Sequence, residues 1–254
     1  MKHSLELEIQ TQPTNTSCGP TCLAAVYDYW GSHVDLRELI TAIGELESGG
    51  TLAVHLACDA LARGYDVEMV TYNLQFFDPT WFDADGEMLS RDVMNEKLQA
   101  QWTAKRTRRD VDQLRLFNAT EAYLQFLSLG GRIRMQPLDE KLIVDTLVRG
   151  IPILCGLSAT YLYHERRERI EAVDASRVEA IPDDIHGDPS GHFVVLHGYD
   201  PSTTSVLIAD PLHPNPMAPT NKYAAPLSRL TSAILLGIVT YDANIMTIVP
   251  RSDF

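Results

Sequence analysis

The stretch from Gln12 to Gly31, Q-P-T-N-T-S-C-G-P-T-C-L-A-A-V-Y-D-Y-W-G, constrains the fold most, because it joins a polar loop to a helix and puts a cysteine at the junction. Cys18 is followed by Gly-Pro, and proline is favoured at the first helical position, where its missing N–H is not needed. Apolar residues then recur at helical spacing as far as Gly31, a typical helix end. The sulfur of Cys18 is therefore predicted to lie at a helix N-terminus, where unpaired N–H groups and the helix dipole favour a thiolate.

The bulk composition excludes several classes of protein. A net charge of −13 argues against a nucleic-acid partner, because a phosphate backbone would repel the chain. The four cysteines have no tight repeated spacing, which fits a reducing compartment rather than a disulfide scaffold. The N-terminus has no signal-peptide core, and no apolar run approaches the ~20 residues of a membrane span. We therefore expect a soluble cytoplasmic protein that needs no membrane; the sequence does not indicate its oligomeric state.

The character of the chain changes near residue 150. Helices are predicted before it: one from Cys18, one opened by a capping box at Asp35, one over 52–63, and exposed helices that elaborate the core near 78–118. Short apolar runs after it indicate buried strands, with one helix between the last of them. The predicted strands cover residues 151–157, 193–197, 206–209, 238–241 and 245–249, and the predicted helix covers 228–236.

These elements predict an α+β fold in a single domain spanning residues 1–254. We expect a helical N-terminal lobe over about residues 10–150, packed on a C-terminal antiparallel β-sheet lobe over about 151–250. A polar insert at 158–190 interrupts the second lobe, and a connection of that length is usually functional or mobile.

A reactive thiolate needs a proton partner, and His192 is the best candidate by position. It opens the predicted strand G-H-F-V-V-L-H-G-Y-D, which can hold an imidazole at fixed geometry. Asp210 ends the next strand, 18 residues later, so an antiparallel hairpin would bring it beside His192 to orient the ring. Gln12, six residues before Cys18, carries an amide that could stabilise an oxyanion together with the Cys18 backbone N–H.

Gln12 followed by Cys18-Gly-Pro, then G-H-F-V-V-L-H-G-Y-D and D-P-L, resembles the bacteriocin-processing, double-glycine leader peptidase family. The resemblance implies a papain-like cysteine peptidase fold with Gln12, Cys18, His192 and Asp210 as its catalytic set. Its motifs cover the start and the last third of the chain, and residues 73–150 match them only loosely. Without membrane helices or a Walker motif, the chain is more similar to the stand-alone bacterial members than to the transporter-fused ones.

Some of these residues have simpler explanations. Cys18 could be a packing cysteine, since free cysteine is among the most buried residue types. Cys22, one helical turn on, is expected to be structural. Cys18 and Cys22 could supply two metal ligands, but the sequence has no second pair of ligands that matches them. His197 should point to the opposite face of the strand from His192 because side chains alternate, so it remains only a second candidate for the base.

The insert at 158–190 allows two interpretations: a solvated charged segment, or a lid over the cleft, since it runs directly into His192. Its Tyr161 and Tyr163, with Gly191 after it, are candidates for substrate contact. The K-R-T-R-R run at 105–109 is expected to be a solvated face.

The combined expectation is a cysteine peptidase or amidase that hydrolyses a peptide or amide bond through a thioester. It would act on a peptide or protein substrate and requires no metal or organic cofactor. Two alternatives remain open: a catalytically silent peptide-binding domain of the same fold, and a transglutaminase-like or peptide-ligating acyl transferase.

Overall fold

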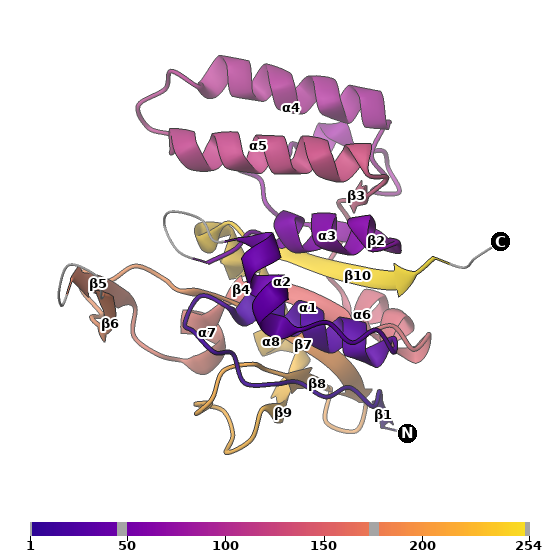
Figure 1. The fold of residues 1–254 in the computed structure, drawn as a ribbon, viewed down its shortest axis with the longest axis vertical. Coiled ribbons are helices and arrows are strands. Elements are labelled where there is room, and N and C mark those ends of the chain that lie inside the picture. The colour runs from indigo at the N-terminus through magenta and orange to yellow at the C-terminus, as the bar shows by residue number, and fades with distance from the viewer. Residues whose placement is uncertain (1, 45–49, 173–177, 252–254) are drawn as a thin grey trace.

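The computed structural model describes residues 2–44, 50–172 and 178–251, and it has the predicted α+β fold (Figure 1). Within these residues the main sheet has eight strands, and β2 pairs with β3 in parallel while the other neighbours are antiparallel. The sheet order is β3 (Arg132–Arg134), β2 (Tyr65–Thr71), β10 (Asn244–Pro250), β4 (Ile153–Ser158), β7 (Gly191–Asp200), β8 (Ser205–Ala209) and β9 (Lys222–Pro226), with β1 (His3–Ser4) paired to β7.

Helices cover both faces of this sheet, because its strands are apolar on both sides. Alternate residues of β4 and β7 belong to two separate buried clusters, as the period-two geometry of a strand requires. The helical elements with buried residues in the first cluster are α1 (Cys18–Tyr29), α2 (Leu36–Ile43), α3 (Ala53–Ala62), η1 (Pro79–Trp81), α4 (Arg91–Lys105) and α5 (Gln113–Ser128). Those with buried residues in the second are α6 (Glu140–Val148), α7 (Ala159–Tyr163) and α8 (Leu227–Leu236). Helix α4 lies on α5 (Figure 1).

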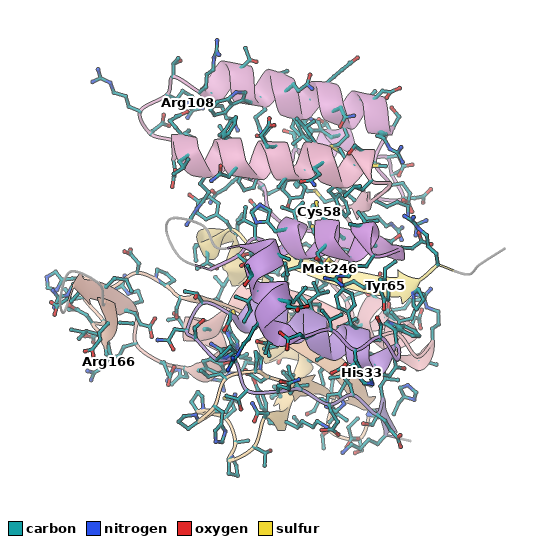
Figure 2. All side chains as sticks on the ribbon, viewed as in Figure 1. His33, Cys58, Tyr65, Arg108, Arg166 and Met246 are labelled. Atoms are coloured by element: carbon teal, nitrogen blue, oxygen red, sulfur yellow. The ribbon has the colours of Figure 1, made fainter. Side chains whose placement is uncertain are left out.

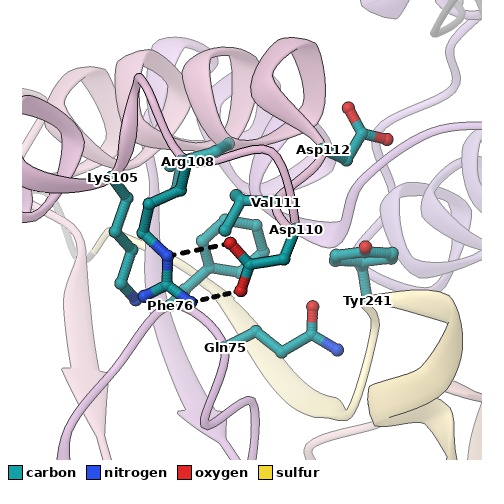
Figure 3. A pocket seen from close by; sticks show the side chains of 9 residues that line it. Gln75, Phe76, Lys105, Arg108, Asp110, Val111, Asp112 and Tyr241 are labelled. Carbon is teal, nitrogen blue, oxygen red and sulfur yellow. Dashed lines mark hydrogen bonds and ion pairs between the residues drawn. The ribbon is translucent and has the colours of Figure 1, made fainter.

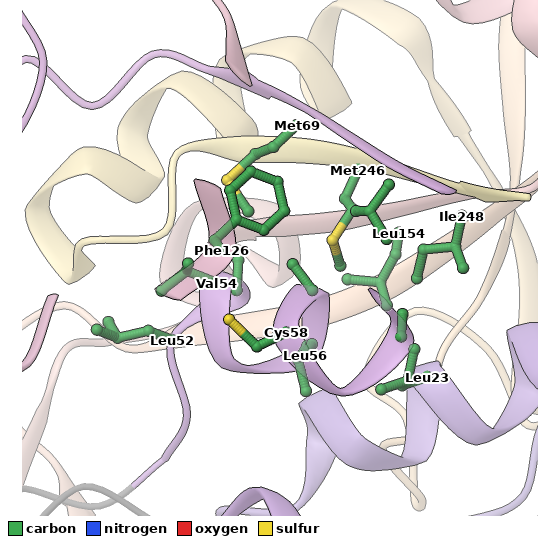
Figure 4. Packing of buried hydrophobic residues seen from close by; sticks show 14 of the residues in the cluster. Leu23, Leu52, Val54, Leu56, Cys58, Met69, Phe126, Leu154, Met246 and Ile248 are labelled. Carbon is green, nitrogen blue, oxygen red and sulfur yellow. The ribbon is translucent and has the colours of Figure 1, made fainter. Parts of the chain in front are cut away.

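The first cluster sits between α3 and the sheet. Cys58 projects from α3 on the side of this cluster, and Met69 and Met246 project from the facing strands (Figure 4). By contrast, Arg108 and Arg166 lie at the periphery of the molecule (Figure 2). The core is thus built under α1 and α3, and α1 is the helix that begins with Cys18.

Helix starts follow the sequence signals closely. The Asp35 side chain accepts hydrogen bonds from the backbone N–H groups of Arg37 and Glu38 at 2.9 and 3.0 Å, which confirms the predicted cap of α2. Helix α1 begins at Cys18, so Pro20 is its third residue rather than its first. Proline fits there because the first four N–H groups of a helix have no acceptor within it.

Two features of the predicted sheet need correction. The strand predicted at 238–241 is wrong: Gly237–Thr240 forms the 3₁₀ helix η2, and Asp242 N–H donates to Gly237 O at 3.1 Å as the chain turns into β10. The alternation of Val67, Met69 and Thr71 in the sequence correctly predicts strand β2, but this strand joins the main sheet between β3 and β10, so the sheet is not confined to the C-terminal lobe. The apolar run at 238–241 is too short for its periodicity to distinguish a strand from a helical turn.

The insert at 158–190 contains α7 (Ala159–Tyr163) and a two-stranded sheet of β5 (Glu168–Ala172) and β6 (Val178–Pro182); its residues 173–177 lie outside the described part of the chain. Both ends of the insert are joined beside β7. Ala159 N–H donates to Ser190 O, and Ser190 N–H donates to Thr160 Oγ1, both at 2.9 Å. The insert therefore leaves and re-enters the sheet next to His192.

Asp242, two residues after η2, is a buried carboxylate at the N-terminus of α3, where its Oδ1 accepts from Ala53 N–H at 2.9 Å. Burial raises the pKa of Asp242 to about 7, although this hydrogen bond and the charge of Arg115 oppose the rise. An unfolded aspartate has a pKa of about 4, so the folded state binds an extra proton between these two pH values and loses stability as the pH rises through them. We expect Asp242→Asn to raise the free energy of unfolding at pH 8, with a much smaller effect at pH 4, in urea titrations at both values. An equal effect at the two pH values would contradict this.

Candidate active site

Cys18 opens α1 at the end of a tightly bonded loop. Ser17 Oγ donates to Thr14 O and accepts from Thr14 N–H, both at 3.0 Å, which fixes the turn before the helix. The Cys18 side chain is 8% exposed. The loop-to-helix junction predicted from the sequence therefore puts the sulfur in the first turn of α1.

His192 is the second residue of β7 and pairs with Leu157 of β4, so the neighbouring strand fixes its backbone. Its Nε2 lies 2.9 Å from Asp210 Oδ1, and Cys18 is near enough for its charge to act on the ring. Because Nε2 is engaged by Asp210, Nδ1 is the ring nitrogen left for the thiol. The carboxylate therefore orients the imidazole, and Cys18 lies near the same ring.

Asp210 is fully buried directly after β8, and its carboxylate accepts four hydrogen bonds. Oδ1 accepts from His192 Nε2 and from Leu212 N–H, both at 2.9 Å. Oδ2 accepts from the hydroxyls of Tyr163 at 2.7 Å and Tyr223 at 2.8 Å. The antiparallel β7–β8 pair, in which Val195 faces Ala209, brings Asp210 beside His192 as the hairpin argument predicts.

The charges of this set favour an imidazolium and a carboxylate. Burial alone lowers the pKa of His192, but the charge of Cys18 and the hydrogen bond to Asp210 outweigh it and raise that pKa to about 10. Burial raises the pKa of Asp210, and the bond and charge of His192, with the other donors, lower it below its ordinary range. A protonated ring between a sulfur and an ionised carboxylate is the arrangement that a thiolate nucleophile needs.

Gln12 is tied to both sides of the site. Its backbone N–H donates to Pro211 O, next to Asp210, and its Nε2 donates to Thr14 O, each at 2.9 Å. An amide nitrogen carries two protons, so one Nε2–H remains available to a ligand. The predicted oxyanion donor is therefore anchored between the Cys18 loop and the Asp210 loop.

The three residues suggested for substrate contact differ in exposure. Tyr161 is 44% exposed on α7, and Gly191 is exposed at the start of β7. Tyr163 is buried instead, with its hydroxyl on Asp210 and its ring centroid 5.9 Å from that of His192. Tyr223 was missed by the sequence analysis, because its contact with Asp210 depends on the pairing of β9 with β8.

His197 and the other cysteines have structural surroundings. His197 lies 3.3 Å from Leu5 O through Nδ1, and burial lowers its pKa. Cys22 Sγ donates to Phe193 O at 3.2 Å, and burial raises the pKa of Cys22. Burial likewise raises the pKa of Cys58 to about 12 and that of Cys155. These contacts agree with the structural roles expected for Cys22 and His197.

Over residues 2–44, 50–172 and 178–251, the structure brings together no group of three or more His, Cys, Asp or Glu side chains that could hold a metal ion.

A separate cavity of about 390 Å³ lies where the α4–α5 turn meets the core (Figure 3). Its walls include Phe76 and Tyr241, and Arg108 forms an ion pair with Asp110 beside it. Lys105 lines the cavity and is partly exposed, whereas the other four residues of the K-R-T-R-R run are exposed, as the predicted solvated face requires. None of the proposed catalytic residues lines this cavity.

No helix in the described part of the chain combines the length and the apolar composition that crossing a bilayer requires.

Comparisons with known proteins give a family and three similar structures. The sequence model of the Peptidase_C39 like family matches residues 4–225. No curated protein matches the chain. The chain is similar to a C39-like peptidase from Bacillus anthracis, with 14% identity, full coverage of both chains and a TM-score of 0.43.

Two further solved structures show a similar level of likeness. The first is the peptidase domain of Streptococcus ComA, a bifunctional ABC transporter of a quorum-sensing pathway, with 11% identity, 97% and 100% coverage of the two chains and a TM-score of 0.43. The second is a double-glycine-motif protease from an AMS/PCAT transporter in complex with the leader peptide, with 12% identity, 99% coverage of both chains and a TM-score of 0.45.

Proposed function

Because this chain belongs to the Peptidase_C39 like family, we propose that it is a cysteine peptidase that hydrolyses a peptide or amide bond through a thioester at Cys18. The observation that most supports the proposal is the His192–Asp210 contact of 2.9 Å, with Cys18 near enough to act on the same ring by its charge. A nucleophile, a base and an orienting carboxylate on three different elements are the parts that acyl transfer requires.

In the proposed mechanism the Cys18 thiolate attacks the substrate carbonyl carbon, and the carbonyl oxygen becomes an oxyanion. The imidazolium of His192 gives its Nδ1 proton to the leaving amine as the C–N bond breaks, which leaves an acyl-thioester on Cys18. His192, now neutral, then takes a proton from water as the water oxygen attacks the thioester. The acid leaves, and the proton on His192 restores the thiolate–imidazolium pair. Asp210 accepts from Nε2–H throughout and so keeps Nδ1 facing the sulfur.

The oxyanion would be held by the Cys18 backbone N–H and by the free Nε2–H of Gln12. Helix N–H groups in the first turn have no acceptor within the helix, so that of Cys18 is available. The bonds of Gln12 to Pro211 and Thr14 support this role, since they hold the amide before substrate arrives.

The proposal is tested by incubating the protein with an activity-based cysteine-peptidase probe and then profiling cleavage of a peptide library. We expect one labelled cysteine, Cys18, and new peptide termini that appear only with active protein. Products joined to an added amine would indicate acyl transfer instead of hydrolysis. Peptide binding with neither labelling nor cleavage would indicate a silent binding domain.

Alkylation gives a prediction that needs no substrate. At mildly acidic pH, we expect iodoacetamide to modify Cys18 at least tenfold faster than Cys22, Cys58 or Cys155, because burial raises the pKa of each of those three thiols. Mass spectrometry of peptides after timed labelling measures the four rates separately. Equal rates, or no labelling of Cys18, would count against an activated thiolate.

A further inference from the structure

Two tyrosine hydroxyls are the only hydrogen-bond donors to Asp210 Oδ2 in the described part of the chain. Tyr163 and Tyr223 donate to Oδ2 at 2.7 and 2.8 Å, while Oδ1 serves His192 and the Leu212 N–H. An ionised carboxylate has about four acceptor positions, so these four donors satisfy it completely. Without two of these donors, the ionised form of this fully buried carboxylate would have a much higher free energy.

The two tyrosines reach Asp210 from unrelated segments. Tyr163 ends α7, at the entrance to the 158–190 insert, and Tyr223 lies in β9 of the main sheet. Asn221, two residues before Tyr223, donates through Nδ2 to Asp210 O at 2.7 Å and accepts from Asp210 N–H at 2.8 Å. The backbone of Asp210 is thus held by one segment, and its side chain by both.

From this arrangement we infer that Tyr163 and Tyr223 are positioning residues that together keep Asp210 ionised and directed at His192. The inference rests on the function proposed above. Each hydroxyl donates its single hydrogen bond to Oδ2, so Oδ1 remains free to accept from His192 Nε2–H. An ionised Asp210 holds His192 as the imidazolium that partners the Cys18 thiolate, and a protonated Asp210 would not.

The other groups around Asp210 do not replace these donors. His192 supplies the only cation bonded to the carboxylate in the described residues, and Cys18 lies beyond it. Cys22 of α1 is influenced by the charge of Asp210, and burial is the main cause that raises its pKa. Arg229 of α8 acts on Tyr223 by its charge and forms no ion pair with Asp210. The pKa of Asp210 is lowered by His192, the Leu212 N–H and Tyr163 together, against the effect of burial.

The test compares Tyr163→Phe, Tyr223→Phe and the double variant with the parent, through the pH dependence of Cys18 alkylation by iodoacetamide. A hydrogen bond to a charged group is worth about one to two pKa units. We expect the acid limb of the rate profile to move up by about one to two pH units in each single variant. In the double variant the acid limb should move by more than the sum of the two single shifts, because Oδ2 then has no donor. The acid limb of kcat/KM for a cleaved peptide should move in parallel.

Tyr199→Phe is the matched control, since it removes a tyrosine-to-carboxylate bond of 2.6 Å to Glu140 elsewhere in the fold. Its acid limb should coincide with that of the parent. A reactive Cys18 whose acid limb is the same in the parent and in both single variants would overturn the inference and leave the proposed function standing. A parent Cys18 no more reactive than the other cysteines would overturn both. If the double variant does not fold, the two single variants decide.

Discussion

Cys18→Ala is expected to abolish peptide hydrolysis, with kcat/KM reduced by a factor of about a thousand or more. The proposed thioester forms on Sγ, and alanine leaves no atom at that position to attack the carbonyl. The His192–Asp210 contact does not depend on the sulfur, so the variant should still fold and bind peptide. The measurement is the cleavage rate of the best peptide from a library profile, together with isothermal titration calorimetry of the same peptide.

Cys22→Ala is the control for this variant, because it lies one turn along the same helix and removes the same atom type. Its sulfur donates to Phe193 O in the core, so we expect a modest loss of stability and nearly parental cleavage. Parental activity in Cys18→Ala would end the nucleophile hypothesis. If Cys22→Ala lost as much activity as Cys18→Ala, the loss in both variants would come from a disturbed α1 helix and not from the missing Cys18 thiol.

The parts of the site that the sequence predicts are those that depend on local geometry. The Cys18 position follows from a loop and a helix start that are adjacent in the chain. The His192–Asp210 contact follows from two consecutive antiparallel strands, whose connection is short enough that strand start and strand end must meet. Each of these relations spans fewer than twenty residues, and turn and pairing rules are sufficient for them.

The parts that could not be predicted depend on packing between distant segments. Tyr223 reaches Asp210 because β9 pairs with β8, yet Lys222–Pro226 has no strand pattern strong enough to predict that pairing. The η2 turn was predicted as a strand because its apolar run is too short to have a clear period. The buried Tyr163 looks like an exposed insert residue in the sequence, and only the docking of α7 beside β7 gives its hydroxyl a partner.

The same contrast explains why the sequence says little about the substrate. The reaction type depends on a few side chains at fixed spacing, whereas a binding surface is formed by segments that the fold brings together. Gly191 and Thr240 illustrate this: a Cβ on Gly191 would lie 2.8 Å from Thr240 Oγ1, although the two residues are far apart in the chain. The surface beside His192 is therefore shaped by η2, whose position the sequence does not give.

His192→Ala is expected to reduce kcat/KM about a thousandfold or more, because the variant loses both the proton donor for the leaving amine and the cation beside the thiolate. It also leaves the buried Asp210 Oδ1 with only the Leu212 N–H as donor, so some loss of stability should accompany the loss of activity. The diagnostic readout is therefore Cys18 alkylation at mildly acidic pH, which should fall toward the rate of an ordinary thiol even in protein that remains folded.

His197→Ala provides the matched control, since it removes the same side chain from the same strand, five residues on. Its Nδ1 contact is with Leu5 O, so its loss should weaken the docking of the N-terminal segment and leave the alkylation of Cys18 unchanged. If His197→Ala slowed alkylation and His192→Ala did not, His197 would be the base and the proposed order of the catalytic set would be wrong. If neither variant changed the rate, the thiol would owe its reactivity to the start of α1 alone, and the His192–Asp210 contact would be a structural hydrogen bond.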